Sequence, residues 1–313
     1  MRCCAKAWPD GTGAAVGRRR GGRAINGWLC LDKPAGLTSA RAVARVLAAT
    51  DAIKAGHGGT LDPMATGILP IALGEATKTT AYAMAGAKTY RFTVAWGESR
   101  DTDDAEGVVT GTSDRRPTEA EIGAALGSFI GEIDQTPPSY AAIKVDGQRA
   151  YKLARQGNPA TMTPRRVRID RLELLSLDDA DHAVFEMDCG KGVYVRSLAR
   201  DLAHRLGTLG HVSGLRRTAV GAFLEAHAIS LEKLEDLGHS AALFEHVRPV
   251  ETALDDIPAL AVTDQQAAQL KFGQAVHVFC NEPGMVRATA DGRLVALAEV
   301  NDGMARPVRV FNL

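Results

Sequence analysis

One short segment concentrates the residues best suited to chemistry. Residues 56–67 read GHGGTLDPMATG, so Asp62 stands between a glycine-rich run and Pro63. Glycines let the backbone approach a ligand closely, and a proline biases the preceding residue toward an extended conformation, so the Asp62 carboxylate is held on a fixed piece of loop. Taken alone, Asp-Pro is typical of a turn. No Gly-Lys-Ser/Thr follows, which excludes a phosphate-cradling P-loop.

The other candidate residues belong to a series of short motifs that follow one another along the chain. The segments are Lys33-Pro34-x-Gly36-x-Thr38-Ser39, Gly56-His57-x-Gly59-Thr60-Leu61-Asp62-Pro63-x-Ala65-Thr66-Gly67, Gly74-Glu75-Ala76-Thr77-Lys78, Lys88-x-Tyr90, Asp101-Thr102-x-Asp104, Pro137-Pro138-x-Tyr140-x-Ala142-x-Lys144, Tyr194-Val195-Arg196-Ser197-Leu198 and Leu215-Arg216-Arg217. The series resembles the motifs of the tRNA pseudouridine synthase B family. Gly58 departs from the family pattern, in which Thr or Ala is usual. This difference affects the expected stiffness of the loop and not its chemistry.

The resemblance implies an enzyme that isomerises uridine 55 in the T loop of tRNA. The reaction breaks the bond between uracil N1 and ribose C1′, turns the base and joins C5 to C1′. It needs no redox step, so it needs no cofactor. By resemblance Asp62 is the catalytic aspartate, acting in its ionised form by attack on C1′ or by promoting glycal formation. The target nucleotide must first be flipped out of the folded loop.

The same resemblance gives Asp62 two catalytic companions. The family pairs the arginine of its Tyr-x-Arg motif, here Arg196, with the aspartate, and a guanidinium opposes the rise in pKa that desolvation imposes on a carboxylate. Arg196 is expected at a helix N-terminus, where the dipole repels a cation, so an anion nearby would account for it. Tyr90 would stack on the target base and offer its phenolic oxygen for proton transfer; the alternative is simple core packing.

Three further residues are expected around the uracil by resemblance. His57 would support the flipped base, while Tyr194 and Leu215 would line the uracil pocket. The alternative for Tyr194 and Leu215 is a place in the hydrophobic core.

Charged residues of the motifs are expected to bind phosphates or to support the pocket. These candidates are Lys33, Lys78 and Lys144, with Arg216 and Arg217, although each charge alone is more often part of a solvated face. Asp104 is expected to pair with Lys78 near the active site. A metal cluster of Asp104 with its neighbouring aspartates is the alternative, but the family uses no metal.

The elements that must position these residues indicate an α+β fold. A strand is expected at residues 28–31, a helix at 38–49, an alternating strand at 89–97 and a helix at 118–129 opened by a capping box. Further strands are expected around residues 167–169, 184–189 and 193–195, before a helix at 197–206. We therefore predict a catalytic domain over residues 25–249, with a mixed or antiparallel sheet flanked by helices.

The pattern changes near residue 250. A short helix at 263–271 and four brief strands near 276–279, 285–289, 294–300 and 308–311 predict a small β-barrel. This part resembles the family's C-terminal RNA-binding domain of PUA type. Residues 250–313 are accordingly predicted as a second domain.

Composition limits the remaining function classes. Of 313 residues, 45% are hydrophobic and 24% are charged, with 37 basic residues against 37 acidic ones, as in an ordinary globular protein. No apolar run approaches the roughly 18 to 20 residues that span a bilayer. Five scattered cysteines without a C-x-x-C pair exclude a zinc ribbon and indicate a reducing compartment. We expect a cytoplasmic, monomeric enzyme without metal, cofactor, membrane contact or obligate protein partner, acting on tRNA.

The first 24 residues form a basic, glycine-rich arm. They hold six basic residues and one acidic residue and lack the apolar region of a secretory signal. We interpret the arm as a disordered tail without a family counterpart; an arm that touches nucleic acid is the alternative.

Two alternatives to this function come from other functional classes. An RNA-binding, tRNA-folding factor without catalysis is the first, although a dead homologue would be expected to lose Asp62, Tyr90 or Arg196. A carboxylate-based hydrolase is the second, but glycosidases generally need two carboxylates and this loop supplies one.

Overall fold

The computed structural model describes residues 17–18, 21–145, 147–158, 160–280 and 282–313. Within these residues, eleven strands form one mixed sheet and five form a smaller C-terminal sheet. No helix in the described ranges is long and apolar enough to cross a membrane.

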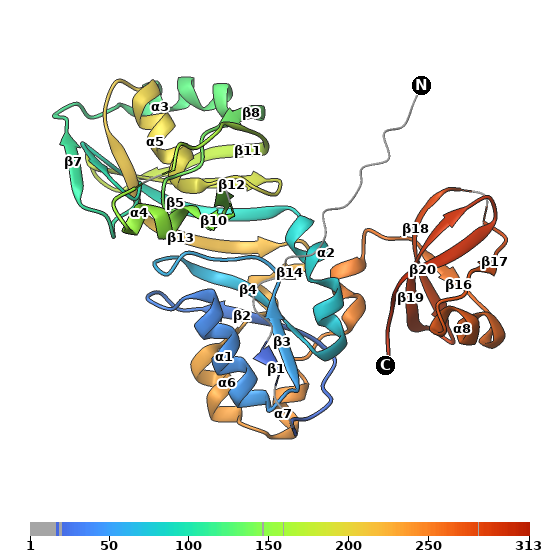
Figure 1. Cartoon of the computed structure of the whole chain (residues 1–313). Coiled ribbons are helices and arrows are strands. Elements are labelled where there is room, and N and C mark those ends of the chain that lie inside the picture. Colours follow the sequence, from blue (N-terminus) through green and yellow to red (C-terminus); the bar gives the residue numbers. More distant parts are fainter. Residues whose placement is uncertain (1–16, 19–20, 146, 159, 281) are drawn as a thin grey trace.

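The large sheet has two halves that meet at its centre (Figure 1). The first half carries helices α1 (Ser39–Thr50), α6 (Leu231–Leu237) and α7 (Ala241–Phe244), with η1 (Gly74–Thr79) and α2 (Thr80–Ala85) near its edge. Its strands are β1 (Gly17–Arg18), β2 (Gly27–Lys33), β3 (Lys54–His57), β4 (Thr66–Leu73) and β15 (Ile229–Ser230).

The second half carries α3 (Glu119–Leu126), the 3-10 turn η2 (Gly127–Phe129) and α5 (Val195–Arg205). Its strands are β13 (Gly210–Val220), β5 (Lys88–Trp96), β12 (His182–Cys189), β11 (Arg165–Leu177), β8 (Gly131–Gln135) and β14 (Phe223–Leu224). Two small hairpins, β6 (Glu98–Arg100) with β7 (Val109–Thr112) and β9 (Lys144–Val145) with β10 (Gln148–Arg149), flank it, and α4 (Ala150–Arg155) follows the second hairpin.

Local sequence patterns explain several of these elements. In β5 the alternation buries Phe92, Val94 and Trp96 and leaves Arg91 exposed. The capping box of α3 is present, since Thr118 accepts from the Glu121 amide while the Glu121 carboxylate accepts from the Thr118 amide.

Strands β4 and β13 join the two halves by a parallel pairing, with Thr66 opposite Arg216 and Gly67 opposite Arg217. A Cβ atom on Gly67 would stand 2.2 Å from the carbonyl oxygen of Arg217, and Gly67 has a φ of +98°. Only glycine fits this close approach without displacing backbone. The junction therefore brings the loop before β4 next to β13.

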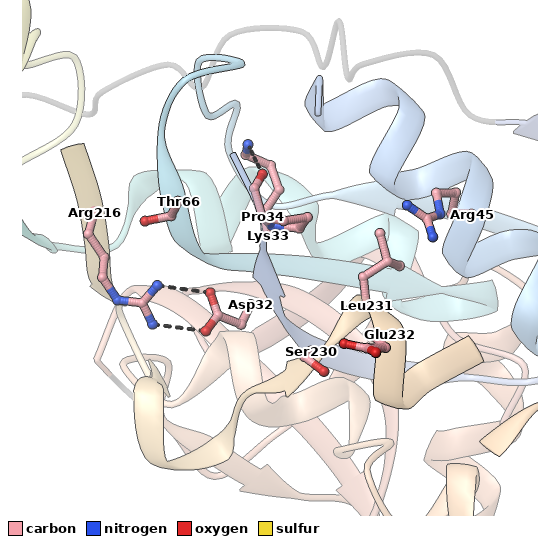
Figure 2. Close-up of a pocket in the computed structure, with 9 residues that line it drawn as sticks. All are labelled: Asp32, Lys33, Pro34, Arg45, Thr66, Arg216, Ser230, Leu231 and Glu232. Atoms are coloured by element: carbon pink, nitrogen blue, oxygen red, sulfur yellow. Dashed lines mark hydrogen bonds and ion pairs between the residues drawn. The ribbon is translucent and has the colours of Figure 1, made fainter. Parts of the chain in front are cut away.

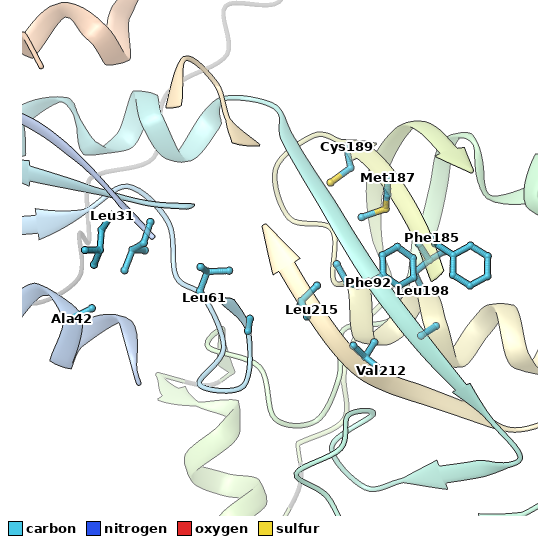
Figure 3. Close-up of a cluster of buried hydrophobic side chains, with 14 of the residues drawn as sticks. Leu31, Ala42, Leu61, Phe92, Phe185, Met187, Cys189, Leu198, Val212 and Leu215 are labelled. Atoms are coloured by element: carbon cyan, nitrogen blue, oxygen red, sulfur yellow. The ribbon is translucent and has the colours of Figure 1, made fainter. Parts of the chain in front are cut away.

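Buried side chains run through both halves as one cluster. Leu61 and Leu215 lie between the group around Leu31 and the group around Phe92 and Phe185 (Figure 3). The loop that carries Asp62 is thus anchored through Leu61 in a core that continues on both sides of the junction.

The smaller sheet has the strand order β16 (Ala259–Ala261), β18 (Gly284–Ala290), β19 (Arg293–Asn301), β20 (Met304–Val310) and β17 (Val276–His277), with α8 (Asp264–Lys271) packed on it. The predicted α+β class with a small C-terminal β domain is confirmed.

The boundary at residue 250 stays a prediction. The turn η4 (Val250–Leu254), the last element before this sheet, packs in a core cluster with Trp28 of β2. This cluster also contains Phe311, so residues from both sheets share it.

Part of the N-terminal arm contacts the first half of the sheet. The Arg23 amide donates to the Asp51 carbonyl at 2.6 Å, and the Arg23 guanidinium lies 4.5 Å from the centre of the Phe244 ring. Gly17 and Arg18 pair with β3. The backbone and the arginine at this end of the arm therefore find partners, while the disorder expected for residues 1–24 stays a prediction. Residues 1–16 and 19–20 lie outside the described part.

Candidate active site

The Asp62 loop connects β3 to β4 and is held by hydrogen bonds to its backbone. Ser39, at the start of α1, accepts from the Leu61 amide at 2.8 Å and donates to the Leu61 carbonyl at 3.0 Å. The Gly36 amide donates to the Pro63 carbonyl at 2.8 Å. The residues on both sides of Asp62 are therefore fixed to the α1 end of the first half.

Two buried cations hold the same loop by its carbonyl oxygens. Lys33 donates to Pro63 at 3.2 Å, and Arg217 donates to Gly59 at 3.0 Å and to Thr60 at 3.3 Å. Lys33 is 0% exposed and Arg217 is 1% exposed. Burial lowers the pKa of Lys33 to about 8, while the Asp62 carboxylate opposes this shift.

Asp62 forms an ion pair with Arg196, the second residue of α5. Nε of Arg196 lies 3.0 Å from Oδ2 of Asp62, and their side chains are 5% and 34% exposed. Although close, this nitrogen makes no aligned hydrogen bond to a described atom. The pair is therefore a one-sided electrostatic contact and not the bidentate fork that an Arg–carboxylate pair can form.

The other guanidinium nitrogens of Arg196 explain why the fork is absent. Nη1 donates to the Thr102 carbonyl at 2.9 Å and lies 3.5 Å from Oδ2 of Asp104, and Nη2 donates to the Tyr140 carbonyl at 3.2 Å. Arg196 is thus fixed by two loops outside the Asp62 loop, and this anchoring directs Nε toward Asp62.

Asp62 and Arg196 open into a pocket of about 740 Å³ between the two halves of the sheet. Tyr90 of β5, Leu215 of β13 and Tyr194, which precedes α5, line the same pocket, as does His57 of β3. Six of the sequence-predicted site residues therefore meet in one cavity, although they are drawn from segments up to 158 residues apart.

Burial sets the protonation of the uncharged lining residues. It raises the pKa of Tyr90, against the opposing Arg217 guanidinium, and it raises the pKa of Tyr194, so both phenols are neutral near pH 7. Burial, together with Arg217, lowers the pKa of His57. Nδ1 of His57 is buried without a hydrogen-bond partner in the described residues, and the lowered pKa keeps this ring neutral near pH 7.

Other predicted site residues do not face the pocket. Lys78 forms an ion pair with Glu75 at 2.6 Å and donates to the Val310 carbonyl at 2.8 Å, so the expected Asp104–Lys78 pair is wrong. Asp104 is 3% exposed and lies beside Arg196 instead. Lys33 is too buried to meet a phosphate at the surface.

Arg216 points away from the Asp62 pocket, toward a second cavity. It makes a two-pronged ion pair with Asp32, at 3.0 and 2.9 Å (Figure 2). Lys144 begins β9, beside the lining residues Ala142 and Ile143, while its side chain lies outside the described part.

Sequence reasoning underrated two lining residues, Arg217 and Lys88. Both residues belong to the sequence motifs given above, and this was the sequence signal that could have identified them. Arg217 binds backbone carbonyls of distant segments, which a sequence pattern does not reveal, whereas Lys88 binds the carbonyls of Met84 and Gly86 just before it. Among the described residues, no group of three His, Cys, Asp or Glu side chains is arranged to hold a metal ion.

Comparison with known proteins covers nearly the whole chain. The TruB family pseudouridylate synthase N-terminal domain matches residues 45–195, the tRNA pseudouridylate synthase B C-terminal domain matches residues 196–255, and the tRNA pseudouridine synthase II C-terminal domain matches residues 257–312.

Relatives of known name agree with these matches. The chain is 55% identical to tRNA pseudouridine synthase B of Caulobacter vibrioides, over 95% of this chain and 100% of that protein. It is 50% identical to tRNA pseudouridine synthase B of Rhodospirillum rubrum, over 95% of this chain and 100% of that protein.

Solved structures extend the similarity to the fold. A chain in the crystal structure of a Cbf5-Nop10-Gar1 complex is 26% identical, with a TM-score of 0.70 over 91% of this chain and 84% of that one. The chain belongs to the tRNA pseudouridine synthase B family, the isomerases that convert uridine to pseudouridine in tRNA.

Proposed function

We propose that the target is uridine 55 in the T loop of tRNA and that Asp62 is the catalytic aspartate. The observation that carries this proposal is the Asp62–Arg196 pair at 3.0 Å in a pocket of about 740 Å³ lined by two tyrosines and Leu215. Such a pocket is large enough for one nucleoside and offers flat, apolar and charged groups together.

Asp62 is suited to act on the ribose. Its side chain is 34% exposed, so it can reach a ligand, and the Arg196 guanidinium lies 3.0 Å from it. A carboxylate can attack C1′ or remove a proton from C2′ as the N1–C1′ bond breaks, and both routes release uracil. After the base turns, C5 bonds to C1′ while the Asp62–C1′ bond breaks in the first route, or while Asp62 returns the proton to C2′ in the second. C5 then loses its proton, and N1 gains one. Atoms and electrons balance without an oxidant, reductant or cofactor.

The surrounding residues would retain the detached uracil. Tyr90 offers a flat neutral ring for stacking and a phenolic group for proton transfer, and Leu215 and Tyr194 close the pocket walls. His57, which also lines the pocket, would support the base. Because a base inside a folded T loop is inaccessible, the nucleotide would be flipped into the pocket.

The domain assignments complete the proposal. Residues 25–249 would form the catalytic domain and residues 250–313 a PUA-like domain that binds RNA, preceded by the arm at 1–24. Binding of tRNA would involve both domains, with the chain acting as a monomer.

The test is to map pseudouridine in an unmodified tRNA transcript after incubation with the purified protein. We expect pseudouridine at position 55, both in a standard buffer and in monovalent salt with a chelator, provided that the transcript stays folded. Activity lost on chelation and restored by a divalent ion would contradict the metal-free mechanism. Release of free uracil would instead support a hydrolase, and tight binding without isomerisation would support an RNA-folding factor.

A further inference from the structure

Two buried cations line the Asp62 pocket and have no part in the mechanism above. Lys88, the first residue of β5, is 8% exposed, and Arg217 of β13 is 1% exposed. Lys88 donates to the carbonyls of Met84 and Gly86, each at 2.5 Å.

The charge of these two groups is not balanced locally. In the described residues, neither Lys88 nor Arg217 forms an ion pair with a carboxylate: both donate to backbone carbonyls, and Arg217 also meets the Tyr90 phenol. Asp62 is the one acidic residue among the described lining residues, and Arg196 is already paired with it. The pocket therefore holds more positive than negative charge, and buried unpaired charge favours an anionic ligand.

Lys88 and Arg217 differ in how many of their N–H donors are already used. Arg217 uses Nε on Ile68 at 2.8 Å and both Nη nitrogens on the Asp62 loop, so its role is to hold that loop. An ammonium group has three N–H donors, and Lys88 uses two of them on carbonyls. Among the described residues the third has no partner, and Lys88 lines the pocket, so this donor can meet a molecule bound there.

We propose that Lys88 is a further catalytic residue, whose ammonium group stabilises the negative charge on uracil when the N1–C1′ bond breaks. This inference rests on the proposed function. The electron pair of the broken bond stays with the ring and spreads over N1, O2 and O4, while Asp62 meets the electron deficit of the sugar. Lys88 keeps its proton and donates a hydrogen bond. When C5 bonds to C1′ the ring charge is neutralised, and the proton lost from C5 is matched by the one gained at N1.

The groups around Lys88 set the pH range of this role. Burial, with the Arg217 guanidinium and Lys191, lowers the pKa of Lys88 to about 8. Burial raises the pKa of the nearby Cys189 thiol to about 12, so the thiol is neutral at pH 7 and supplies no negative charge to balance Lys88. Lys88 is therefore mainly charged at pH 7 and loses its charge as the pH rises through about 8.

The first test compares Lys88→Met and Lys88→Arg with wild type in single-turnover assays at saturating tRNA. Loss of one donor to a developing oxyanion costs roughly 10²-fold in rate, so we expect a fall of about that size for Lys88→Met and a smaller one for Lys88→Arg. Affinity for tRNA should stay within a few-fold. Lys191→Met, which removes an exposed lysine just after β12, is the matched control and should retain the wild-type rate.

The leaving group provides a second readout that a structural role would not affect. A tRNA with 5-fluorouridine at the target position releases a more stable anion, so the defect of Lys88→Met should shrink when consumption of the original nucleoside is followed. An equal defect on both substrates would overturn the proposal. So would weakened binding with an unchanged saturated rate, which would indicate a phosphate contact.

The pH profile completes the test. The wild-type rate should decline above about pH 8, whereas Lys88→Arg should keep its rate there, because a guanidinium stays protonated. Lys33, whose pKa is also about 8, is present in both proteins, so a decline that persists in Lys88→Arg would contradict the assignment. Absence of pseudouridine with wild-type protein would reject the proposed function itself. An active wild type with a fully active Lys88→Met would reject the role of Lys88 and leave the proposed function intact.

Discussion

Buried cations in this protein bind backbone carbonyls more than they bind carboxylates. Lys33 and Arg217 hold the carbonyls on either side of Asp62, and three bonds to neutral groups stabilise each of these charges inside the fold. A buried charge without such bonds would cost several kcal/mol. These two residues therefore help to fix the backbone on both sides of Asp62.

The first residue-scale prediction concerns Asp62→Asn. The change keeps size and shape but removes the charge, so the side chain can neither attack C1′ nor remove a proton. We expect the single-turnover rate to fall by at least ~10² to 10⁴, or roughly 3 to 5.5 kcal/mol in activation free energy. Affinity for tRNA, measured by filter binding, should remain within a few-fold, because phosphate contacts elsewhere supply most of it.

Folding must be checked in that experiment, since Arg196 loses the partner 3.0 Å away. Circular dichroism of wild type and variant serves as the control, and a stability loss of about 1 to 3 kcal/mol is acceptable. A folded variant with more than about a tenth of the wild-type rate would remove Asp62 from the catalytic role.

The residues of the pocket were predictable to the extent that their motifs are specific. Asp62, Arg196 and Tyr90 were expected together and do line one cavity. Lys78 was not placed correctly, because a lysine finds its partner through the tertiary fold: here Glu75 and the Val310 carbonyl lie close, and Asp104 does not pair with it. Arg217 was expected to support the pocket or bind phosphate, and its hydrogen bonds to the Asp62 loop match the first option.

Local patterns predicted elements better than the way in which those elements pair. The expected strand at residues 89–97 is β5, and the expected helix at 197–206 overlaps α5, since alternation and a leucine stripe are local properties. The parallel pairing of β4 with β13 joins Gly67 to Arg217, 150 residues away in sequence. That pairing depends on the packing of the whole sheet, so no local sequence pattern predicts it.

Gly67→Ala tests this pairing at the scale of the element. The added methyl would meet the Arg217 carbonyl at 2.2 Å, and the residue would be strained at φ +98°, so β4 and β13 must separate. We expect a loss of about 1 to 3 kcal/mol in unfolding free energy from overpacking, measured by urea denaturation, and a reduced rate because the Asp62 loop moves.

Gly123→Ala is the matched control for the substitution. Gly123 lies in α3, and an added Cβ would meet nothing within 4 Å. This change should stabilise the protein by up to about 1 kcal/mol, because alanine favours a helix over glycine. Equal effects of the two substitutions would contradict the close approach of β4 and β13.

At the scale of the whole molecule, the C-terminal residues fasten the small sheet to the large one. The Val310 carbonyl accepts from Lys78 at 2.8 Å, and the Asn312 amide donates to the Glu75 carboxylate at 2.8 Å. Between them, Phe311 is 0% exposed and belongs to the same cluster as Trp28, Phe223 and Leu297. Polar contacts at the edge and an aromatic ring in the core therefore fix the end of β20 to η1.

Phe311→Ala tests whether this docking couples the stability of the two sheets. Truncating a fully buried phenylalanine costs about 3 to 5 kcal/mol, and here the cavity would open between the sheets. We expect calorimetry to show the small sheet unfolding at a lower temperature than in wild type, and limited proteolysis to cut faster near residues 255–259. The single-turnover rate at a temperature where the variant is folded should stay near that of wild type, because Phe311 does not line the Asp62 pocket. Leu313→Ala, at a residue 50% exposed, is the control and should leave unfolding unchanged. If Phe311→Ala unfolds like this control, the shared core does not link the two sheets and their relative position must depend on the polar contacts of Lys78 and Glu75.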